Sequence, residues 1–435
     1  MTLQAATKGR VLEPADADFE PASKPWNVAV PQSVAAVVEA TDADDVASVV
    51  RYARKEGLTV AVQPNGHGAS GNADGVILLR TKALQTIEVN AAERTAKVGA
   101  GVSWGQAQAA TEAHGLTGLP GSAPVVSVVG YTLGGGLGWF ARKYGLAAHS
   151  VRAFDLVDAD GNQQHVTADS DADLFWALRG SGGDLAIVTA VEYGLYEAPG
   201  LYGGALAWPA DKAADVLATF KEVTAQAPDE LTLWFGRLEI PNGPPPMVAI
   251  QAAYLGDADA GQALLAAFDK LGDPLQDTRQ ERTLAELAAI TNDPTDPSPG
   301  KGRSSMLTSL NDDVTETLLD GSLAPLLALQ LRHTGGALAA AGPDAGPHGS
   351  IAEPYLLYAF GLPLSPELAA GISTKLDEYE AKLGDNVSGR KPFTFLTGGE
   401  SASDAFDQPT IERLRQLKRD RDPANVFRSN YPVLD

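Results

Sequence analysis

Two glycine-rich segments carry the residue types best suited to holding a bulky anionic ligand. The first reads Gln-Pro-Asn-Gly-His-Gly-Ala-Ser over residues 63–70, and the second runs over residues 118–138. Glycine lets a backbone approach another group closely, because it lacks Cβ and tolerates positive φ. Successive backbone N–H groups in such turns form a concave site for phosphate oxygens. His67 lies inside the first segment, where a ring nitrogen is available to bond to a cofactor.

The second segment contains Gly-Leu-Pro-Gly-Ser-Ala-Pro at residues 118–124 and Thr-Leu-Gly-Gly-Gly-Leu-Gly at residues 132–138. A further run, Arg-Gly-Ser-Gly-Gly-Asp-Leu-Ala-Ile-Val-Thr, occupies residues 179–189. A glycine triplet alone is a weak signal, since tight turns and strand–helix packing also use glycine. In combination with the His67 loop, these segments indicate contact with a cofactor.

Other sites that glycine or histidine form in proteins are not supported by this sequence. No G-x-G-x-x-G joins a strand directly to a helix with an acid about 20 residues further on, as a nicotinamide-binding fingerprint requires. No Walker loop is present. His333 and His348 lack further ligands at metal-binding spacing. We therefore predict no metal site, and we expect both histidines to be exposed or locally hydrogen-bonded.

Charge and cysteine content exclude several classes of protein. The 435 residues include 33 Lys and Arg against 55 Asp and Glu, a net charge of −22, which argues against nucleic acid and anionic membrane surfaces as partners. No cysteine is present, so disulfides, thiolate metal sites and cysteine nucleophiles are excluded. No apolar run approaches the roughly 18 residues of a membrane span, and the N-terminus lacks an apolar signal region. We expect a cytoplasmic protein without a membrane partner; the sequence does not predict its oligomeric state.

Hydrophobic spacing and turn residues predict an α+β chain. Helices are expected where apolar residues recur at helical spacing after a capping residue, and strands where β-branched runs lie between turns. The expected helices span residues 41–57, 104–114, 171–178, 211–226, 259–271, 366–383 and 409–419. The expected strands span residues 58–62, 76–79, 86–89, 95–98, 151–157, 164–167, 186–193, 205–208, 231–238, 248–254 and 355–360. A Gly/Pro-rich break at residues 342–349 is a candidate mobile lid.

The glycine segments resemble the FAD-binding half of the berberine-bridge-enzyme-like oxidases, in the vanillyl-alcohol-oxidase superfamily of flavoproteins. The similarity is good over residues 30–197 and 410–432 and weak between them. It implies a PCMH-type FAD-binding domain of two subdomains over residues 1–197, completed by residues 405–435. Residues 198–404 are then expected to form a substrate-binding domain, an antiparallel sheet covered by helices.

The resemblance also implies how FAD is attached. His67 aligns with the family histidine that is bonded to the flavin 8α-methyl group, although Gln63 and Asn65 replace the usual Arg and Gly. In the second segment Ala123 replaces the Cys that makes a second flavin bond in many members, and Tyr131 replaces a His. We therefore expect FAD to be linked through His67 only and not bicovalently, as in singly linked bacterial members of the family.

The family motifs imply which residues contact FAD. They come from the two glycine segments, from the 179–189 run, where Asp184 and Leu185 depart from the usual Asn and Phe, and from the closing motif at residues 422–430. The expected contacts are Asn65, Gly66, His67, Gly68, Ala69, Ser70, Pro120, Gly121, Ser122, Val125, Val128, Tyr131, Leu133, Gly134, Gly135, Gly136, Gly138, Ile187, Val188 and Asn430.

Family oxidases transfer a hydride from a C–H bond to flavin N5 while a base takes the O–H or N–H proton. Tyr355 falls where many members carry an acid, whereas Phe395 stands at a usual Tyr position and cannot take a proton. Because strand side chains alternate between faces, Tyr358 inherits the role if the opposite face is inward. Either phenol would need a pKa well below about 10, with Arg303 or Lys391 as the nearby cation.

The implied activity is that of an FAD-dependent oxidase acting on a small alcohol, amine or phenolic metabolite. Val126 matches the family position that gates O2, where a small Val favours oxidase behaviour and H2O2 as co-product. Aromatic residues that alternate on expected strands are divided between the core and the substrate pocket: Trp208, Trp234, Tyr254, Phe393 and Phe395. A carbohydrate oxidase or dehydrogenase, or a flavin-loaded protein with a degenerate active site, is the alternative.

Overall fold

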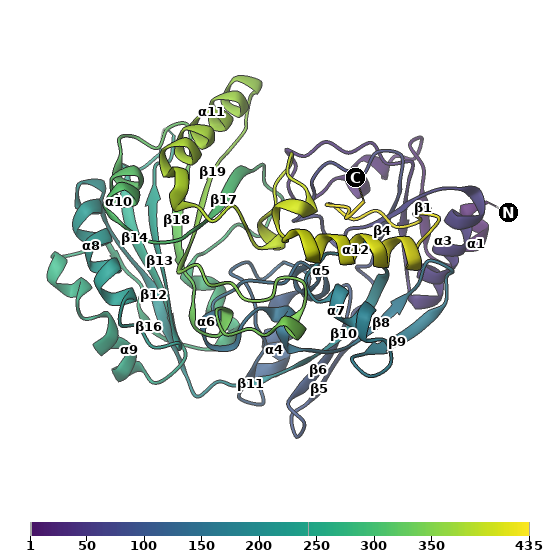
Figure 1. Cartoon of the computed structure of the whole chain (residues 1–435), viewed down its shortest axis with the longest axis horizontal. Coiled ribbons are helices and arrows are strands. Elements are labelled where there is room, and N and C mark those ends of the chain that lie inside the picture. Colours follow the sequence, from purple (N-terminus) through teal and green to yellow (C-terminus); the bar gives the residue numbers. More distant parts are fainter. Residues whose placement is uncertain (1, 242, 435) are drawn as a thin grey trace.

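The computed structural model describes residues 2–241 and 243–434, which fold into two halves lying side by side (Figure 1). The first half holds two main sheets formed by residues 10–194, and both ends of the described chain lie in it. The second half holds one large sheet formed by residues 201–361. Within these residues no helix is long and apolar enough to cross a membrane.

The first sheet has the strand order β1-β2-β4-β3, with β1 antiparallel and the other three parallel. Helix α3 (Ala43–Glu56) packs beside it. Asp42 accepts a hydrogen bond from the backbone N–H of Asp45 at the start of this helix, and Gly57 ends it in the left-handed conformation. The strands and small helices of this layer are β1 (Arg10–Leu12), β2 (Ala36–Glu39), β3 (Val60–Val62), β4 (Ile77–Arg80), α1 (Leu3–Ala6) and α2 (Phe19–Ser23).

The second sheet is antiparallel throughout, in the order β5-β6-β10-β8-β9. Its strands are β5 (Ile87–Asn90), β6 (Thr95–Gly99), β8 (Val151–Val157), β9 (Gln163–Thr167) and β10 (Ile187–Gly194). The same part of the chain forms the helices α4 (Trp104–Glu112), α5 (Val128–Leu133), α6 (Ala141–Tyr144) and α7 (Ala172–Leu178). Two short strands, β7 (Leu116–Thr117) and β11 (Tyr196–Glu197), pair with each other. Ser103 and Gln106 form a capping box at the start of α4.

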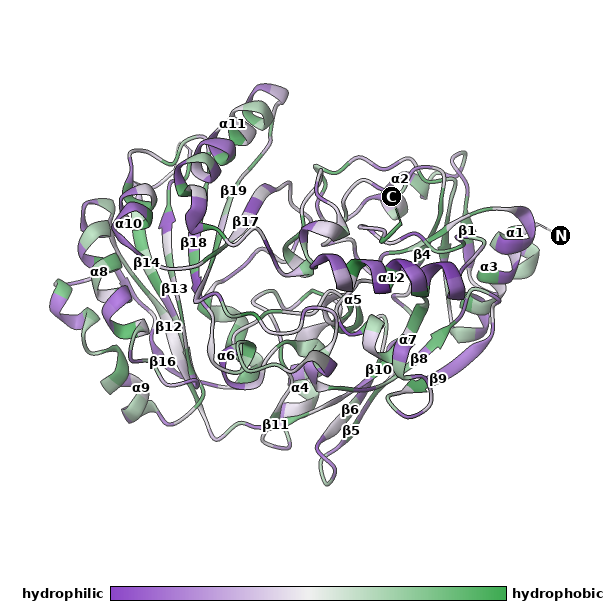
Figure 2. Cartoon of the chain, in the orientation of Figure 1, coloured by the Kyte–Doolittle hydropathy of each residue, from purple (hydrophilic) through white to green (hydrophobic). Residues whose placement is uncertain are grey.

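The last part of the chain returns to the first half through helix α12 (Gln408–Arg421), which is mostly hydrophilic (Figure 2). Lys418 of this helix is nevertheless fully buried, and its Nζ lies 2.8 Å from Asp422 and donates to the carbonyl oxygens of Asp184 and Phe427. The buried Asp184 carboxylate accepts the backbone N–H groups of Ser429 and Val433. This buried cluster fixes residues 422–433 against the first half.

The large sheet is antiparallel, in the order β15-β12-β14-β13-β18-β19-β17, with β16 also paired to β12. Helices α8 (Ala213–Thr224), α9 (Ala258–Leu265), α10 (Asp312–Leu319) and α11 (Pro366–Leu383) cover its outer face (Figure 1). Its strands are β12 (Leu201–Pro209), β13 (Leu231–Leu238), β14 (Met247–Tyr254), β15 (Gln276–Asp277), β16 (Gln280–Arg282), β17 (Lys301–Leu307), β18 (Ala328–His333) and β19 (Tyr355–Gly361).

Side chains alternate across this sheet as the period of a strand requires. Leu233 and Phe235 of β13 are buried beneath the helices. Trp234 points the other way and stacks on Trp139 of the first half, with the ring centroids 3.8 Å apart. Arg142 of α6 also joins the halves. Its guanidinium donates to the backbone oxygens of Leu231, Thr334, Ala227 and Pro228. The inner face of the large sheet therefore meets the first half directly.

Several segments differ from the elements expected from the sequence. Strands β17 and β18 and helix α10 are present but were not expected. The expected helix over 259–271 is divided into α9 and a 3-10 turn at Phe268–Leu271. Phe393–Phe395, expected on a strand, forms a 3-10 turn that follows Pro392. The mobility expected of residues 342–349 stays a prediction.

Candidate active site

Two adjoining cavities lie where the halves meet. The narrow cavity, of about 280 Å³, is lined by the His67 loop, the start of α5, residues 182–188 and residues 428–431. The wide cavity, of about 1250 Å³, lies between the His67 loop and the inner face of the large sheet. They share five lining residues, which are His67, Gly68, Thr394, Leu396 and Tyr431. A ligand in the narrow cavity would therefore be in contact with the contents of the wide one.

His67 is held in one orientation and one protonation state. Its ring stacks on Trp26 with the centroids 4.2 Å apart, and its Nδ1 lies 3.0 Å from Oδ1 of Asn65. The Asn65 amide is fixed in turn, because its Nδ2 donates to the Val125 carbonyl at 2.7 Å. An amide oxygen only accepts, so Nδ1 of His67 carries the hydrogen and Nε2 carries the lone pair.

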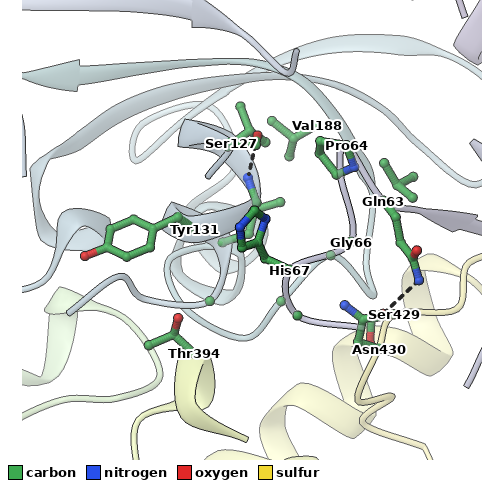
Figure 3. Close-up of a pocket in the computed structure, with 18 of the residues that line it drawn as sticks. Gln63, Pro64, Gly66, His67, Ser127, Tyr131, Val188, Thr394, Ser429 and Asn430 are labelled. Carbon is green, nitrogen blue, oxygen red and sulfur yellow. Dashed lines mark hydrogen bonds between the residues drawn. The ribbon is translucent and has the colours of Figure 1, made fainter. Parts of the chain in front are cut away.

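Nε2 of His67 is buried and has no hydrogen-bond partner among the described residues. Burial lowers the pKa of this imidazole to about 4, so the ring is neutral near pH 7. A buried polar atom without a partner is uncommon in a native protein, and this one belongs to a residue that lines both cavities, where a ligand could reach it. Figure 3 shows His67 among the lining residues, with Tyr131 on one side and the Gln63–Asn430 hydrogen bond on the other.

Gly66 is required in this loop for two reasons. Its φ of +79° is a conformation that residues with Cβ rarely adopt, and a Cβ at this position would lie 2.7 Å from Cα of Pro25. The close approach of the His67 loop to Pro25 brings the neighbouring Trp26 over His67. Of the first segment, Asn65, Gly66, His67 and Gly68 line the narrow cavity, and Ala69 and Ser70 line the wide one.

The second glycine segment is divided between the cavity and its support. Tyr131, Leu133 and Gly134 line the narrow cavity, as does Val126. The other expected contacts line neither cavity, and their contact with FAD stays a prediction: Pro120, Gly121, Ser122, Val125, Val128, Gly135, Gly136 and Gly138. A Cβ at Gly136 or Gly138 would lie within 2.7 Å of the Tyr131 ring or hydroxyl. These glycines therefore make room for the ring that positions this segment.

Residues 182–188 and the closing motif complete the narrow cavity. Ile187, Val188 and Asn430 line it as expected, and so do several residues that the sequence did not single out. Ser70 donates its hydroxyl hydrogen to the Asn430 carbonyl at 2.5 Å, and Tyr431 donates to the Leu396 carbonyl at 2.7 Å. The residues not expected are Val62, Gln63, Pro64, Ala100, Ser127, Val129, Gly130, Gly182, Gly183, Ala186, Phe393, Thr394, Leu396, Arg428, Ser429 and Tyr431.

Tyr355 does not face either cavity, which corrects the first choice of catalytic base. Its hydroxyl lies 2.8 Å from Oγ1 of Thr224 in helix α8, and its ring packs on Phe220. The alternation of strand β19 therefore places Tyr355 in the core beneath the helices and Tyr358 on the opposite face. Tyr358 lines the wide cavity beside Phe395.

The phenol of Tyr358 has surroundings unlike those expected of a base. Burial raises its pKa above the ordinary value of about 10, and the nearby Arg332 only partly opposes that rise. Arg303 and Lys391 are not its cations, because Arg303 pairs with Asp377 and Lys391 with Glu400. In the structure Tyr358 therefore carries its proton near neutral pH, and the residue beside it is Arg332.

The remaining expected residues fall into core and cavity positions. Trp208 is buried in the core of the second half, whereas Phe393 lines the narrow cavity and Phe395 the wide one. His333 and His348 are both buried rather than exposed. His333 lies 2.9 Å from the Arg142 guanidinium, and His348 accepts the N–H of Phe393 at 3.4 Å. No group of His, Asp and Glu able to hold a metal ion is found in the part of the chain that the structure describes.

Comparison with known proteins agrees with this site. Residues 34–167 match a sequence family described as an FAD binding domain. Over 98% of its length the chain is 27% identical to (R)-6-hydroxynicotine oxidase of Paenarthrobacter nicotinovorans, of which it covers 96%. BBE-like 1 of Physcomitrella patens has a similar fold, with a TM-score of 0.87 at 20% identity over 100% of this chain and 99% of that chain.

A second solved structure, the xylooligosaccharide oxidase of Myceliophthora thermophila, superposes with a TM-score of 0.86 at 20% identity and covers 99% of this chain and 98% of that chain. The matched domain and the full-length relative thus make the chain similar to the PCMH-type FAD-linked oxidases, and the solved structures show that it shares their fold. It is an FAD-linked oxidoreductase.

The narrow cavity fits this cofactor. Close to it, the side chains of His67 and Ser429 each bear a buried polar atom that has no partner among the described residues. Glycines at positions 66, 134, 182 and 183 are part of its lining. These residues would hold FAD, with His67 at the boundary to the wide cavity.

Proposed function

We propose that residues 1–197, completed by residues 405–435, bind FAD and that Nε2 of His67 forms the only covalent bond to it. The observation that carries this proposal is the buried, unpartnered Nε2, whose lone pair is fixed by the Nδ1–Asn65 contact. A neutral imidazole nitrogen is the form able to bond to an electron-poor methyl group, and the lowered pKa maintains that form. Ala123 has no nucleophilic group, so it supplies no second bond.

Acid precipitation tests the bond. We expect the yellow colour of the purified protein to stay with the pellet, and His67→Ala to release FAD into the supernatant. His114→Ala is the matched control, because His114 is an exposed histidine of the same half, and it should retain the colour in the pellet. A colourless wild-type pellet with free FAD would refute the covalent bond while leaving FAD binding in place.

We further propose that the chain oxidises a small alcohol, amine or phenolic metabolite bound in the wide cavity by residues 198–404. When bound, the flavin supplies hydride acceptance from the substrate carbon and electron transfer to O2, which gives H2O2. The Tyr358 phenol lies in the wide cavity and carries its proton. Its oxygen accepts a hydrogen bond from the substrate O–H or N–H; as that proton moves to the phenol oxygen, the phenol's own proton passes to water in the cavity, so that the phenol ends the step protonated.

Val126 supports the use of O2. It is half-buried and lines the narrow cavity beside Ser127, so added bulk there would reduce the space next to the cofactor. We expect Val126→Leu to slow reoxidation of the reduced flavin by air and to leave its reduction by substrate nearly unchanged. Stopped-flow absorbance measures both half-reactions. Equal reoxidation rates in the two proteins would remove this role from Val126.

A carbohydrate substrate is the second candidate, because the wide cavity has about 1250 Å³ of space and an oligosaccharide oxidase shares the fold. An anaerobic panel of small alcohols, amines, phenols and oligosaccharides separates the two candidates by which compounds bleach the flavin. If dithionite bleaches the flavin and none of these compounds does, the result favours a flavin-loaded protein with a degenerate active site over an oxidase.

A further inference from the structure

Arg332 is a cation of the wide cavity that is stacked on aromatic rings. It lies on β18, opposite Trp234 of β13 in the sheet register. Its guanidinium carbon is 3.9 Å from the centroid of the Trp234 ring, 5.2 Å from that of Phe395 and 5.8 Å from that of Tyr358. Arginine stacks well on aromatic faces and keeps its in-plane N–H groups free to bind an oxygen ligand.

No carboxylate pairs with Arg332 among the described residues. Nη2 donates to Oε1 of Gln330 at 2.9 Å, Nη1 has no hydrogen bond to a described residue, and Nε is buried without a partner. Asp293 affects the guanidinium only at longer range. Burial lowers the pKa of this group, but from so high an ordinary value that it stays charged. Burying charged N–H groups without hydrogen-bond partners costs free energy. Such an arrangement in a cavity is typical of a ligand-binding site.

Two other cations near this interface have partners within the fold. Arg142 is also buried, but backbone carbonyls accept from all its nitrogens. Arg303 lines the same cavity, but it forms ion pairs with Asp377 and Glu380. A structural role therefore accounts for Arg142 and Arg303 and leaves the free N–H groups of Arg332 unexplained.

The cavity as a whole has the opposite charge to the chain. Its lining contains five Lys and Arg side chains against three Asp and Glu side chains, whereas the chain has a net charge of −22. The lining is therefore net positive although the chain is net negative, which favours an anionic ligand over a cationic one in this cavity.

We propose that Arg332 binds a carboxylate on the substrate, whose flat or aromatic body packs against Phe395 and Tyr358. This inference rests on the proposed function, because it names the substrate class of the same cavity. The substrate is thus a carboxylate-bearing alcohol, amine or phenol. Its carboxylate accepts charge-assisted hydrogen bonds from the free N–H groups of the guanidinium, and its reacting carbon is left toward the boundary with the narrow cavity.

Binding of two matched probes tests the proposal. Benzoate and its neutral analogue benzamide are titrated into the flavin-loaded protein by calorimetry. We expect benzoate to bind at least about 10-fold more tightly than benzamide, as hydrogen bonds to charged groups give. Arg332→Met should weaken benzoate binding by about 10-fold or more and change benzamide binding little, because Met keeps the apolar stem. Arg332→Lys should retain part of the preference.

Arg303→Met is the control, since it removes a cation of the same cavity that is already paired, and it should change the benzoate affinity less than about 3-fold. The proposal would be overturned if the wild type bound benzoate and benzamide with equal affinity. It would also be overturned if both Arg332 variants lost affinity for benzoate and for benzamide to the same degree. A large shift in flavin potential with unchanged benzoate binding would instead assign Arg332 to the cofactor. Flavin content and dithionite bleaching of the same samples report separately on the proposed function.

Discussion

Two tyrosines of strand β19, three residues apart, have different surroundings and make a matched pair of variants. Tyr358→Phe removes the phenol that lines the wide cavity, so we expect flavin reduction by substrate to slow by about 10²-fold, the lower end for proton-transfer catalysis. Tyr355→Phe removes the hydroxyl that is 2.8 Å from Thr224, and we expect it to lower the free energy of unfolding by about 1 kcal/mol.

Anaerobic stopped-flow absorbance and urea unfolding measure the two effects. Tyr355→Phe should leave the reduction rate within a few-fold of the wild type, and Tyr358→Phe should leave the flavin spectrum unchanged. If both variants reduce at the wild-type rate, no tyrosine of this strand takes part in proton transfer, and Asp293, which acts electrostatically on Tyr358, becomes the next residue to test.

Buried histidines give the protein a defined pH dependence. Burial lowers the pKa of both His333 and His348 to about 3, against an ordinary value of about 6.5. Below pH 6.5 the unfolded chain binds protons that the native state does not, so the free energy of unfolding falls as the pH drops from about 6.5 toward 3. At pH 5 each histidine should account for a loss of about 2 kcal/mol.

Urea unfolding at pH 7.5 and pH 5.0 checks this expectation. His348→Gln should reduce the difference between the two pH values by about 2 kcal/mol, whereas His114→Gln, at an exposed position, should not change it. An unchanged difference in the His348 variant would show that this imidazole does not control the acid side of the stability curve.

At the scale of elements, helix α12 depends on one buried charge. Lys418 neutralises the adjoining carboxylates of Asp184 and Asp422, which are themselves buried and hydrogen-bonded to backbone N–H groups. Lys418→Met leaves these carboxylates without a cation, so we expect the free energy of unfolding to fall by about 3–5 kcal/mol.

Hydrogen exchange should show that this loss is accompanied by faster opening of residues 425–433, which the cluster holds in place. Arg419→Met, one position further along but exposed, is the control and should have little effect. Wild-type exchange rates in residues 425–433 of the Lys418 variant would show that the cluster does not hold this segment.

The cluster also gives a reason for Asp at position 184, where the resemblance leads one to expect Asn, since a buried lysine is its neighbour.

Elements with their own local signals could be predicted from the sequence. The caps of α3 and α4 and the spacing of β13 and α11 are such signals, and these elements lie within a few residues of their expected bounds. Strands β17 and β18 were missed because their sequences carry charged residues, among them Lys301 and Arg332, that face a cavity instead of solvent. The 3-10 turn at residues 393–395 was missed because its aromatic alternation imitates a strand.

The same holds for the candidate site: the parts that have a local sequence signal could be predicted, and the others could not. Glycine segments and the His67 loop mark the narrow cavity, because close backbone approach leaves a trace in residue type. Two features of the wide cavity were not predictable: which face of β19 turns inward, and the position of Arg332 against Trp234. Both depend on pairing between strands, which for Arg332 and Trp234 joins positions about 100 residues apart. Such pairing leaves no local pattern in the sequence.

At the scale of the whole molecule, the two halves share one interface instead of being joined by a linker alone. Arg142 bonds to four backbone oxygens of the second half, and Trp139 stacks on Trp234 across the same boundary. The wide cavity lies along this interface, so its shape is fixed by the packing of the halves. A substrate there meets a preformed cavity, which limits the conformational cost of binding.

The return of the chain to its first half also sets an order of events during synthesis. Phe427 pairs with Val60, and residues 428–431 form part of the narrow cavity, although more than 200 residues of the second half separate residue 197 from residue 408. Domains fold as they leave the ribosome, N-terminal parts first. Here the first half stays incomplete until the whole large sheet has been made. We therefore expect flavin to be incorporated late, into a chain whose second half is already synthesised, and a nascent chain stalled within residues 198–404 to be colourless.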